Sequence, residues 1–185
     1  MMDQLNPRAR SDPYGSRINR AHSPLRARGV PYGSIMLGSF LPTLLLADLM
    51  PLLPPTGFLM LLGWRIMRPG LLPVWVGAPL GAFDDLVSGQ PFGSAVLMWS
   101  LAMIAIEMIE ARFPWRGFWQ DWLAAALVIV VYMILAVMVS GSTLSQPLLF
   151  AALPQVAIAI LSYPFLARII AALDRFRLTR TRRLA

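Results

Sequence analysis

The stretch WLAAALVIVVYMILAVMVS, residues 122–140, is uncharged throughout and mostly aliphatic. Its length is close to the ~20 apolar residues that a helix needs to cross a lipid bilayer. The composition of the whole chain agrees, because 57% of its 185 residues are hydrophobic and only 14% are charged. A water-soluble domain of this size could not bury so large an apolar surface. The stretch therefore predicts a membrane-spanning helix in an integral membrane protein.

Five further apolar segments lie on either side of this stretch, separated by breaks rich in Pro, Gly and Ser. We expect them to form spans at residues 33–53, 56–67, 71–87, 92–110 and 148–172. The second of these is short, and if it forms a re-entrant pair with the third, four full spans and a hairpin remain. Short connections make successive spans antiparallel neighbours. The expected fold class is an all-α integral membrane protein, a compact bundle of six transmembrane helices.

All 16 basic residues are Arg, and with 9 acids they give a net charge of +7. With six spans, one assignment places every Arg on one face, because the connections 51–56, 88–91 and 140–147 contain none. The positive-inside rule then puts both termini in the cytoplasm. The arginines expected to orient the chain and to hold anionic lipid include Arg65, Arg68, Arg112, Arg116, Arg168 and Arg175.

Two basic tails are expected to flank the spans. Residues 1–30 mix Arg with Pro, Gly and Ser without helical periodicity, which predicts a disordered cytoplasmic tail. Residues 31–173 would form the transmembrane domain, and residues 174–185 a basic cytoplasmic tail. Both tails flank apolar stretches and nothing resembles a nucleic-acid reading head, so membrane lipid is the expected polyanion and nucleic acid is not an expected partner.

Acidic residues at membrane depth cost ~2.5–3.5 kcal/mol each, so each needs a physical reason. Asp48, Asp84 and Asp85 are expected near the outer turn at 88–91. They could be hydrated among the headgroups or form a ligand or proton site. Alternatively, Asp84 and Asp85 accept hydrogen bonds from the free amides that open the next span, where Pro91 suits the first turn.

Other polar and small residues are expected at helix ends and contacts. Glu107 and Glu110 share one helix face at the inner interface, where we expect them either to extend toward the headgroups or to pair with Arg112 and Arg116. The aromatic cluster FPWRGFWQDW at 113–122 predicts an interfacial belt. Close approach of helices is expected at the glycines Gly77, Gly81, Gly89 and Gly93.

Catalytic templates fit this chain poorly. It has no Cys and no Lys, and its single His, His22, lies in the expected N-terminal tail. Schemes based on Ser–His, Cys–His or a reactive Lys therefore lack a base or a nucleophile. The stretch Gly81-Ala-Phe-Asp84 departs at Phe83 from the GxGD pattern of intramembrane aspartyl proteases. A zinc site would need carboxylates almost alone, which zinc does not favour. We expect neither an enzyme nor a bound cofactor or metal.

Two patches carry a family resemblance: LLLADLMPLLPP at 44–55 and GAFDDLVSGQPFGSAVL at 81–97. In the second patch a Gly, an Asp, a small-Gly turn and a second Gly follow in order, at Gly81, Asp84 or Asp85, Gly89, Pro91 and Gly93. Together with the short Arg-ended segment before Arg68-Pro69, they make the chain resemble the MreD family of rod shape-determining membrane proteins.

That resemblance implies a non-enzymatic role in bacterial cell-wall elongation, at the inner membrane. The family works with the periplasmic scaffold MreC, the actin-like MreB filaments and the RodA/PBP2 synthase pair. Its fold is also thought to be similar to the substrate-binding S components of vitamin transporters. A small-molecule-binding transporter component is therefore the alternative function.

The expected role is a scaffold whose lipid-facing surface receives the single transmembrane helix of a partner. The site expected to fix the junction of the first, third and fourth spans on the outer side comprises Asp48, Gly81, Asp84, Asp85, Gly89, Pro91 and Gly93.

Overall fold

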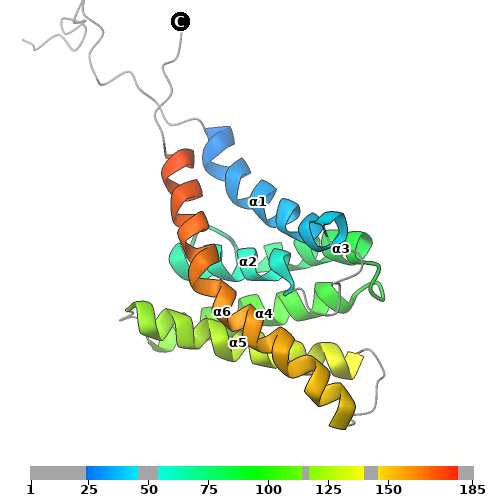
Figure 1. The fold of residues 1–185 in the computed structure, drawn as a ribbon. Coiled ribbons are helices and arrows are strands. Elements are labelled where there is room, and N and C mark those ends of the chain that lie inside the picture. The colour runs from blue at the N-terminus through cyan, green and yellow to red at the C-terminus, as the bar shows by residue number, and fades with distance from the viewer. Residues whose placement is uncertain (1–23, 46–53, 114–116, 140–145, 179–185) are drawn as a thin grey trace, which may run out of the picture.

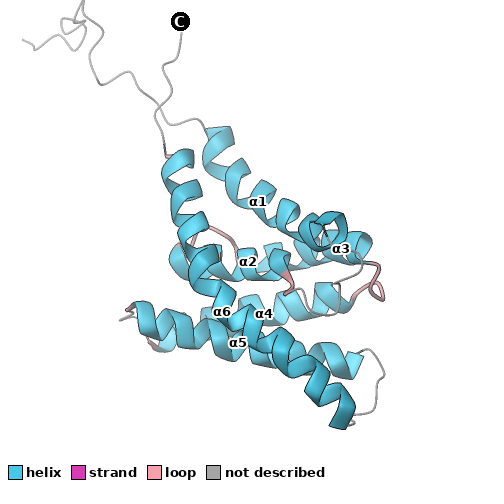
Figure 2. Ribbon diagram, in the orientation of Figure 1, coloured by secondary structure: helices cyan, strands magenta, loops and turns pink. Residues whose placement is uncertain are grey.

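A computed structural model describes residues 24–45, 54–113, 117–139 and 146–178. Within these ranges every regular element is helical and none is a strand (Figure 2). The elements are α1 (Pro24–Leu45), α2 (Thr56–Met67), the short 3-10 turn η3 (Val74–Val76), α3 (Gly77–Ser88), α4 (Ser94–Arg112), α5 (Phe118–Val139) and α6 (Gln146–Arg177). The all-α expectation is confirmed for this part of the chain.

The helices differ in whether they are long enough to cross a bilayer. Among the described residues, α4, α5 and the part Ala152–Arg177 of α6 are both long and apolar enough. α2 and α3 have 12 residues each, which gives only ~18 Å of helix against a hydrocarbon core of ~30 Å. Length and composition thus support three spans, and six full crossings stay a prediction.

The short helix α2 forms the centre of the bundle. Its sequence TGFLMLLGWRIM is apolar around nearly its whole circumference, and a helix of that kind is buried on all sides. Helices α1, α4, α5 and α6 all pack against it, and Figure 1 shows it between α1 on one side and α4 and α5 on the other. Every residue from Gly57 to Ile66 is buried. The core of the fold is therefore built on α2.

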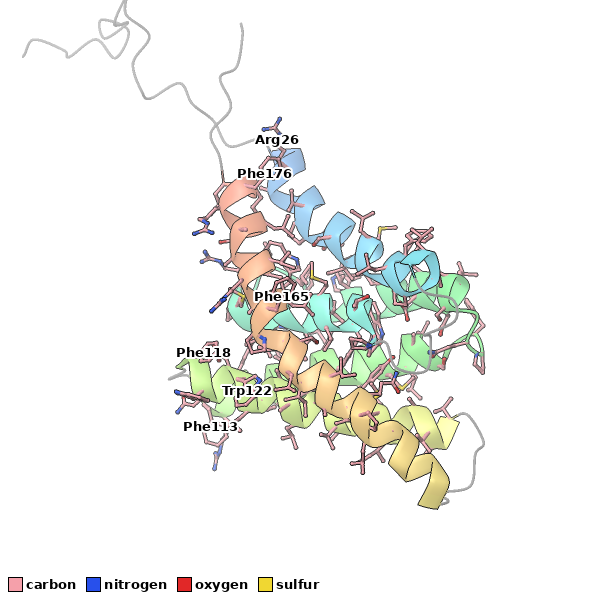
Figure 3. The ribbon with its side chains drawn as sticks, viewed as in Figure 1. Arg26, Phe113, Phe118, Trp122, Phe165 and Phe176 are labelled. Atoms are coloured by element: carbon pink, nitrogen blue, oxygen red, sulfur yellow. The ribbon has the colours of Figure 1, made fainter. Side chains whose placement is uncertain are left out.

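The helix ends gather at two ends of the bundle (Figure 1). α2 and α4 end, and α5 begins, at what we call the arginine end, which carries Arg65 and Arg112. α3 ends and α4 begins at what we call the turn end, which carries Gly89 and Gly93. The aromatic residues Phe113, Phe118 and Trp122 lie together at the arginine end (Figure 3).

The N-terminal helix begins earlier than the sequence suggested. α1 starts at Pro24, so residues 24–30 are helical and do not belong to a disordered tail. Contacts with the end of α6 explain the difference: the Arg177 guanidinium donates to the carbonyl of Ala27 at 3.2 Å. The Arg26 guanidinium also lies 5.9 Å from the centre of the Phe176 ring (Figure 3). Residues 1–23 lie outside the described part of the chain.

The C-terminal helix likewise continues beyond the expected boundary at residue 174. α6 ends at Arg177, and both Asp174 and Arg177 are buried. The Asp174 carboxylate accepts hydrogen bonds from Arg177 Nε at 2.6 Å and from Arg68 Nε at 2.9 Å. These bonds satisfy the charges that made this segment look like a solvated tail.

Two of the four expected packing glycines hold helices close together. A Cβ atom built on Gly81 would lie 2.6 Å from the Ala95 carbonyl oxygen, and one on Gly77 would lie 2.9 Å from the Trp99 carbonyl oxygen. The expectation for Gly89 and Gly93 is wrong, because a Cβ on either would meet nothing within 4 Å. Both have positive φ, at 68° and 99°, so these two glycines shape the turn between α3 and α4 instead.

Candidate functional site

The N-terminus of α4 is capped by a carboxylate from α3. Asp85 Oδ2 accepts from the backbone N–H of Gly93 at 2.8 Å, and Asp85 Oδ1 accepts from the backbone N–H of Ala95 at 2.8 Å. The Ser94 hydroxyl donates to Oδ1 at 3.0 Å, and a longer bond of 3.4 Å joins the Val96 N–H to Oδ2. Asp85 is 3% exposed. The expectation that an acid accepts from the opening amides of this span is confirmed for Asp85.

The local sequence explains why α4 takes its cap from another helix. The residue preceding α4 is Gly93 in the left-handed conformation, which has no side chain to offer. Pro91 was expected in the first turn of the helix, and this is wrong. It lies in the preceding loop, where its carbonyl accepts from the Ser94 N–H at 3.0 Å. Asp85 therefore supplies both the hydrogen bonds and the negative charge that a helix N-terminus favours.

Asp84 lies in a different environment from Asp85. It makes no hydrogen bond to the described amides of α4 but lines a cavity of about 310 Å³, and it is 9% exposed. Ser39 of α1 and Tyr132 of α5 line the same cavity. The expectation of a joint capping role is therefore wrong for Asp84. Asp48, the third acid of the expected group, lies outside the described residues.

The cavity lies between the turn-end portions of five helices, α1, α2, α3, α5 and α6. One side is fixed where α1 crosses α2: the Thr56 hydroxyl donates to the Gly38 carbonyl at 2.5 Å. Next to the cavity, the rings of Phe58 and Tyr132 stack with centres 4.0 Å apart. Polar lining in a cavity between apolar helices marks a place where a polar group can bind within the membrane.

A cluster of ion pairs around the buried Arg65 side chain occupies the arginine end. The Arg65 guanidinium pairs with Glu107 and, at 2.9 Å, with Glu110. Arg65 is a partner that the sequence did not suggest, because α2 brings it to the face of α4 that carries both acids. The expected pairing with Arg116 lies outside the described residues. Arg65 is 2% exposed, so it cannot hold lipid as expected.

The other arginines that were expected to bind lipid lie in different environments. Arg68 pairs with Asp174 of α6, although about half of its side chain is exposed. Arg112, Arg168 and Arg175 are exposed and free to meet lipid headgroups. Arg116 lies outside the described residues.

The sequence reasoning missed Ser39 and Tyr132 at the cavity, and Arg65 as a buried ion-pair partner. A signal existed for all three, because each is a polar residue inside or at the end of an expected span. Among the described residues, no group of three or more His, Cys, Asp and Glu side chains could hold a metal ion. The described polar groups can cap a helix N-terminus, form ion pairs and bind a polar ligand in the cavity.

Comparison with known proteins identifies a family. The profile of the family described as rod shape-determining protein MreD matches residues 36–176. No curated protein and no solved structure matches the chain. The matched region runs from within α1 almost to the end of α6, and therefore contains both the capped α3–α4 junction and the cavity. This chain belongs to the MreD family of rod shape-determining membrane proteins.

Proposed function

We propose that this chain is a non-enzymatic scaffold of the rod complex in the bacterial inner membrane. In that role it receives the single transmembrane helix of an MreC-like periplasmic scaffold. MreB filaments and the RodA/PBP2 synthase would be reached directly or through that partner. Family membership gives the role in rod shape determination, and the absence of Cys and Lys from the sequence favours a scaffold over an enzyme.

The observation that carries the proposal is the outer face of α1, which we define as Gly29, Gly33, Leu37 and Leu44. These positions are four, four and seven residues apart, so they share one side of the helix. A Cβ on Gly29 or Gly33 would meet nothing within 4 Å. Leu37 is 69% exposed and Leu44 is 77% exposed. No described part of the chain covers this face.

The contrast with the other helix glycines supports a partner on this face. In α2 and α3 the glycines lie against neighbouring helices, so that a Cβ on Gly57, Gly77 or Gly81 would collide with Ser39 or with α4. Lipid chains drive no hydrophobic association of helices, and close backbone approach at small residues is what holds transmembrane helices together. Two adjacent-turn glycines left open on α1 therefore favour docking of another helix.

The charge distribution supports the inner-membrane topology with both termini in the cytoplasm. Arg65 and Arg112 lie in the last turns of α2 and α4, both at the arginine end (Figure 1). The connection at 88–91, at the turn end, contains no Arg. The positive-inside rule assigns the arginine end to the cytoplasm.

We assign the residues of the α3–α4 junction a supporting role in partner binding. Gly81 sets the distance between the two helices, and Asp85 holds the start of α4. Gly89, Pro91 and Gly93 form the turn that joins the two helices. Since α1 packs on α3, loosening this junction would alter the position of the docking face.

The test is co-purification of the MreC-like partner with a tagged Gly33→Leu variant, normalised to the amount of chain inserted in the membrane. The Leu side chain would keep the partner helix from packing closely on α1, which should weaken binding by ~1 kcal/mol. We therefore expect on the order of fivefold less partner to co-purify. The matched control is Ala157→Leu, which adds similar bulk to an exposed position of α6. Full recovery of partner with Gly33→Leu, or an equal loss with Ala157→Leu, would exclude α1 as the docking face.

A further inference from the structure

The cavity at the turn end holds a buried acid without a basic counterpart. Asp84 forms no ion pair with any described residue. No Arg, Lys or His occurs in residues 29–64, 69–111 or 117–167, and every residue that lines the cavity falls within these ranges. A carboxylate among apolar helices requires a compensating partner. Among the described residues, no cationic side chain lines the cavity to serve as that partner.

The same cavity is lined by the start of α2. Pro54, Pro55, Thr56 and Gly57 all belong to its lining. Pro55 precedes the helix and provides no side-chain cap, and the first turn contains no acid. The opening N–H groups of a helix carry partial positive charge and favour an anionic group. The cavity is therefore lined both by an acidic side chain and by the start of a helix, where the backbone carries partial positive charge.

A second buried group points to a ligand at this helix start. Ser39 is 4% exposed and lines the cavity. Its Oγ makes no hydrogen bond of ordinary length and angle to any described residue, although it lies near enough to the Asp84 carboxylate to interact with it. It lies directly against the first turn of α2, since a Cβ on Gly57 would collide with it. A buried hydroxyl without a hydrogen bond costs ~1–3 kcal/mol, and a bound polar group would remove that cost.

We propose that this cavity binds a zwitterion, with its ammonium group on Asp84 and its anionic group at the start of α2, beside Ser39. An anion alone would face the Asp84 carboxylate, and a cation alone would place no negative group at the start of α2, where a helix favours one. A primary ammonium has three N–H donors for the carboxylate, whereas a quaternary ammonium has none. The volume of about 310 Å³ is near the lower limit of ~300 Å³ for small-ligand pockets.

Two sources could supply this chemistry: the headgroup of an aminophospholipid such as phosphatidylethanolamine, or a free amino acid. The site differs from the α1 docking face, so it does not depend on the scaffold role. If the co-purification assay excluded partner docking on α1, the zwitterion proposal would still stand. If the ligand experiment excluded zwitterion binding, the scaffold proposal would still stand.

The experiment is native mass spectrometry of the purified full-length chain, mixed in turn with four probes. Three are phosphatidylethanolamine, phosphatidylcholine and phosphatidylglycerol with identical acyl chains, and the fourth is glycine. Two variants alter the cavity: Asp84→Asn removes the charge, and Ala136→Phe fills the space at a lining residue. The control Asp121→Asn makes the same chemical change in the first turn of α5, at the arginine end. Monodispersity by size-exclusion chromatography establishes that each variant is folded.

We expect phosphatidylethanolamine or glycine to be retained at least about tenfold more than phosphatidylglycerol by the wild-type chain and by Asp121→Asn. Both cavity variants should lose that preference. Retention of phosphatidylethanolamine alone identifies a lipid source, and retention of glycine alone identifies a free zwitterion. Equal retention of all three lipids without glycine would overturn the proposal. So would an unchanged preference in Asp84→Asn and Ala136→Phe, because the ligand would then bind elsewhere.

Discussion

Replacing Asp85 by Asn tests the capped α3–α4 junction most directly. Both carboxylate oxygens accept backbone N–H groups, Oδ2 from Gly93 and Oδ1 from Ala95, each at 2.8 Å. An Asn side chain has the same shape but only one acceptor oxygen, and its NH₂ group is a donor. Whichever way the amide is turned, the NH₂ group faces a backbone N–H. One short hydrogen bond is therefore lost in either orientation.

The size of the effect follows from these contacts. A buried N–H left without an acceptor costs ~1–3 kcal/mol. Loss of the negative charge at the start of α4 costs ~0.3–1 kcal/mol, and up to ~2 kcal/mol where the site is partly buried. Asp85 is 3% exposed, so water cannot easily replace the lost acceptor. We expect Asp85→Asn to lower the free energy of unfolding by about 2–4 kcal/mol.

The assay is equilibrium unfolding of the purified chain in mixed detergent and dodecyl sulfate, followed by circular dichroism. The matched control is Asp84→Asn, which removes the same charge one residue earlier but no hydrogen bond to α4. Ser94→Ala removes one hydroxyl donor and keeps both short backbone bonds, so it should cost no more than about 1 kcal/mol. The reasoning is refuted if Asp85→Asn unfolds within about 0.5 kcal/mol of wild type, or if Asp84→Asn costs as much.

Three further predictions address packing, charge pairing and topology. In the same unfolding assay, Gly81→Ala should destabilise the chain by ~1–3 kcal/mol, because the added methyl group clashes with backbone atoms. Gly29→Ala places its methyl group in open space and should be neutral or stabilising by up to ~1 kcal/mol. Equal effects of the two substitutions would contradict the packing assignment. Arg65→Met should cost ~1.5–3 kcal/mol because it removes the buried guanidinium that pairs with Glu107 and Glu110, and changing both glutamates to Gln should recover most of that loss. A variant as stable as wild type would contradict the ion-pair assignment. The chain has no Cys, so a single introduced Cys can be labelled specifically. Gln90→Cys should react with a membrane-impermeant maleimide in intact spheroplasts, whereas Arg112→Cys should react only after permeabilisation. The reverse pattern would show that the topology is inverted.

Much of the fold could be predicted from apolar segment length. The uncharged stretch at 122–140 corresponds to most of α5, and the expected segment 56–67 coincides with α2. The ends of the outer helices could not be predicted, because tertiary contacts decide them. Residues 24–30 have tail-like composition, yet they are helical where Arg177 of α6 binds the backbone of α1. Pairing of this kind between positions 150 residues apart leaves no local trace in the sequence.

The candidate site was predictable in residue type but not in role. The rule that a buried acid needs a partner correctly singled out Asp84 and Asp85. It could not separate them, because adjacent residues on a helix point about 100° apart and therefore meet different neighbours. The rule also paired Glu107 with arginines close in sequence, whereas helix packing brings Arg65 to it from α2. Sequence distance is a poor guide to charge pairing once a bundle forms.

Acids at the two ends of the bundle have different sources of positive charge, and the proposed topology accounts for the difference. At the arginine end, Glu110 and Asp174 are neutralised by guanidinium groups, and those cations also lie near the C-termini of α2 and α6, where helix dipoles favour positive charge. At the turn end the sequence places no Arg, so a helix N-terminus is the remaining source of positive potential. α4 provides one for Asp85 through hydrogen bonds. α2 provides another beside the cavity of Asp84, but without a hydrogen bond to that acid among the described residues. If the proposed topology keeps the cations on one face, the acids of the opposite face depend on helix N-termini for positive charge. Asp84 has no hydrogen bond to such a terminus among the described residues, and the proposed zwitterion would supply the missing positive group.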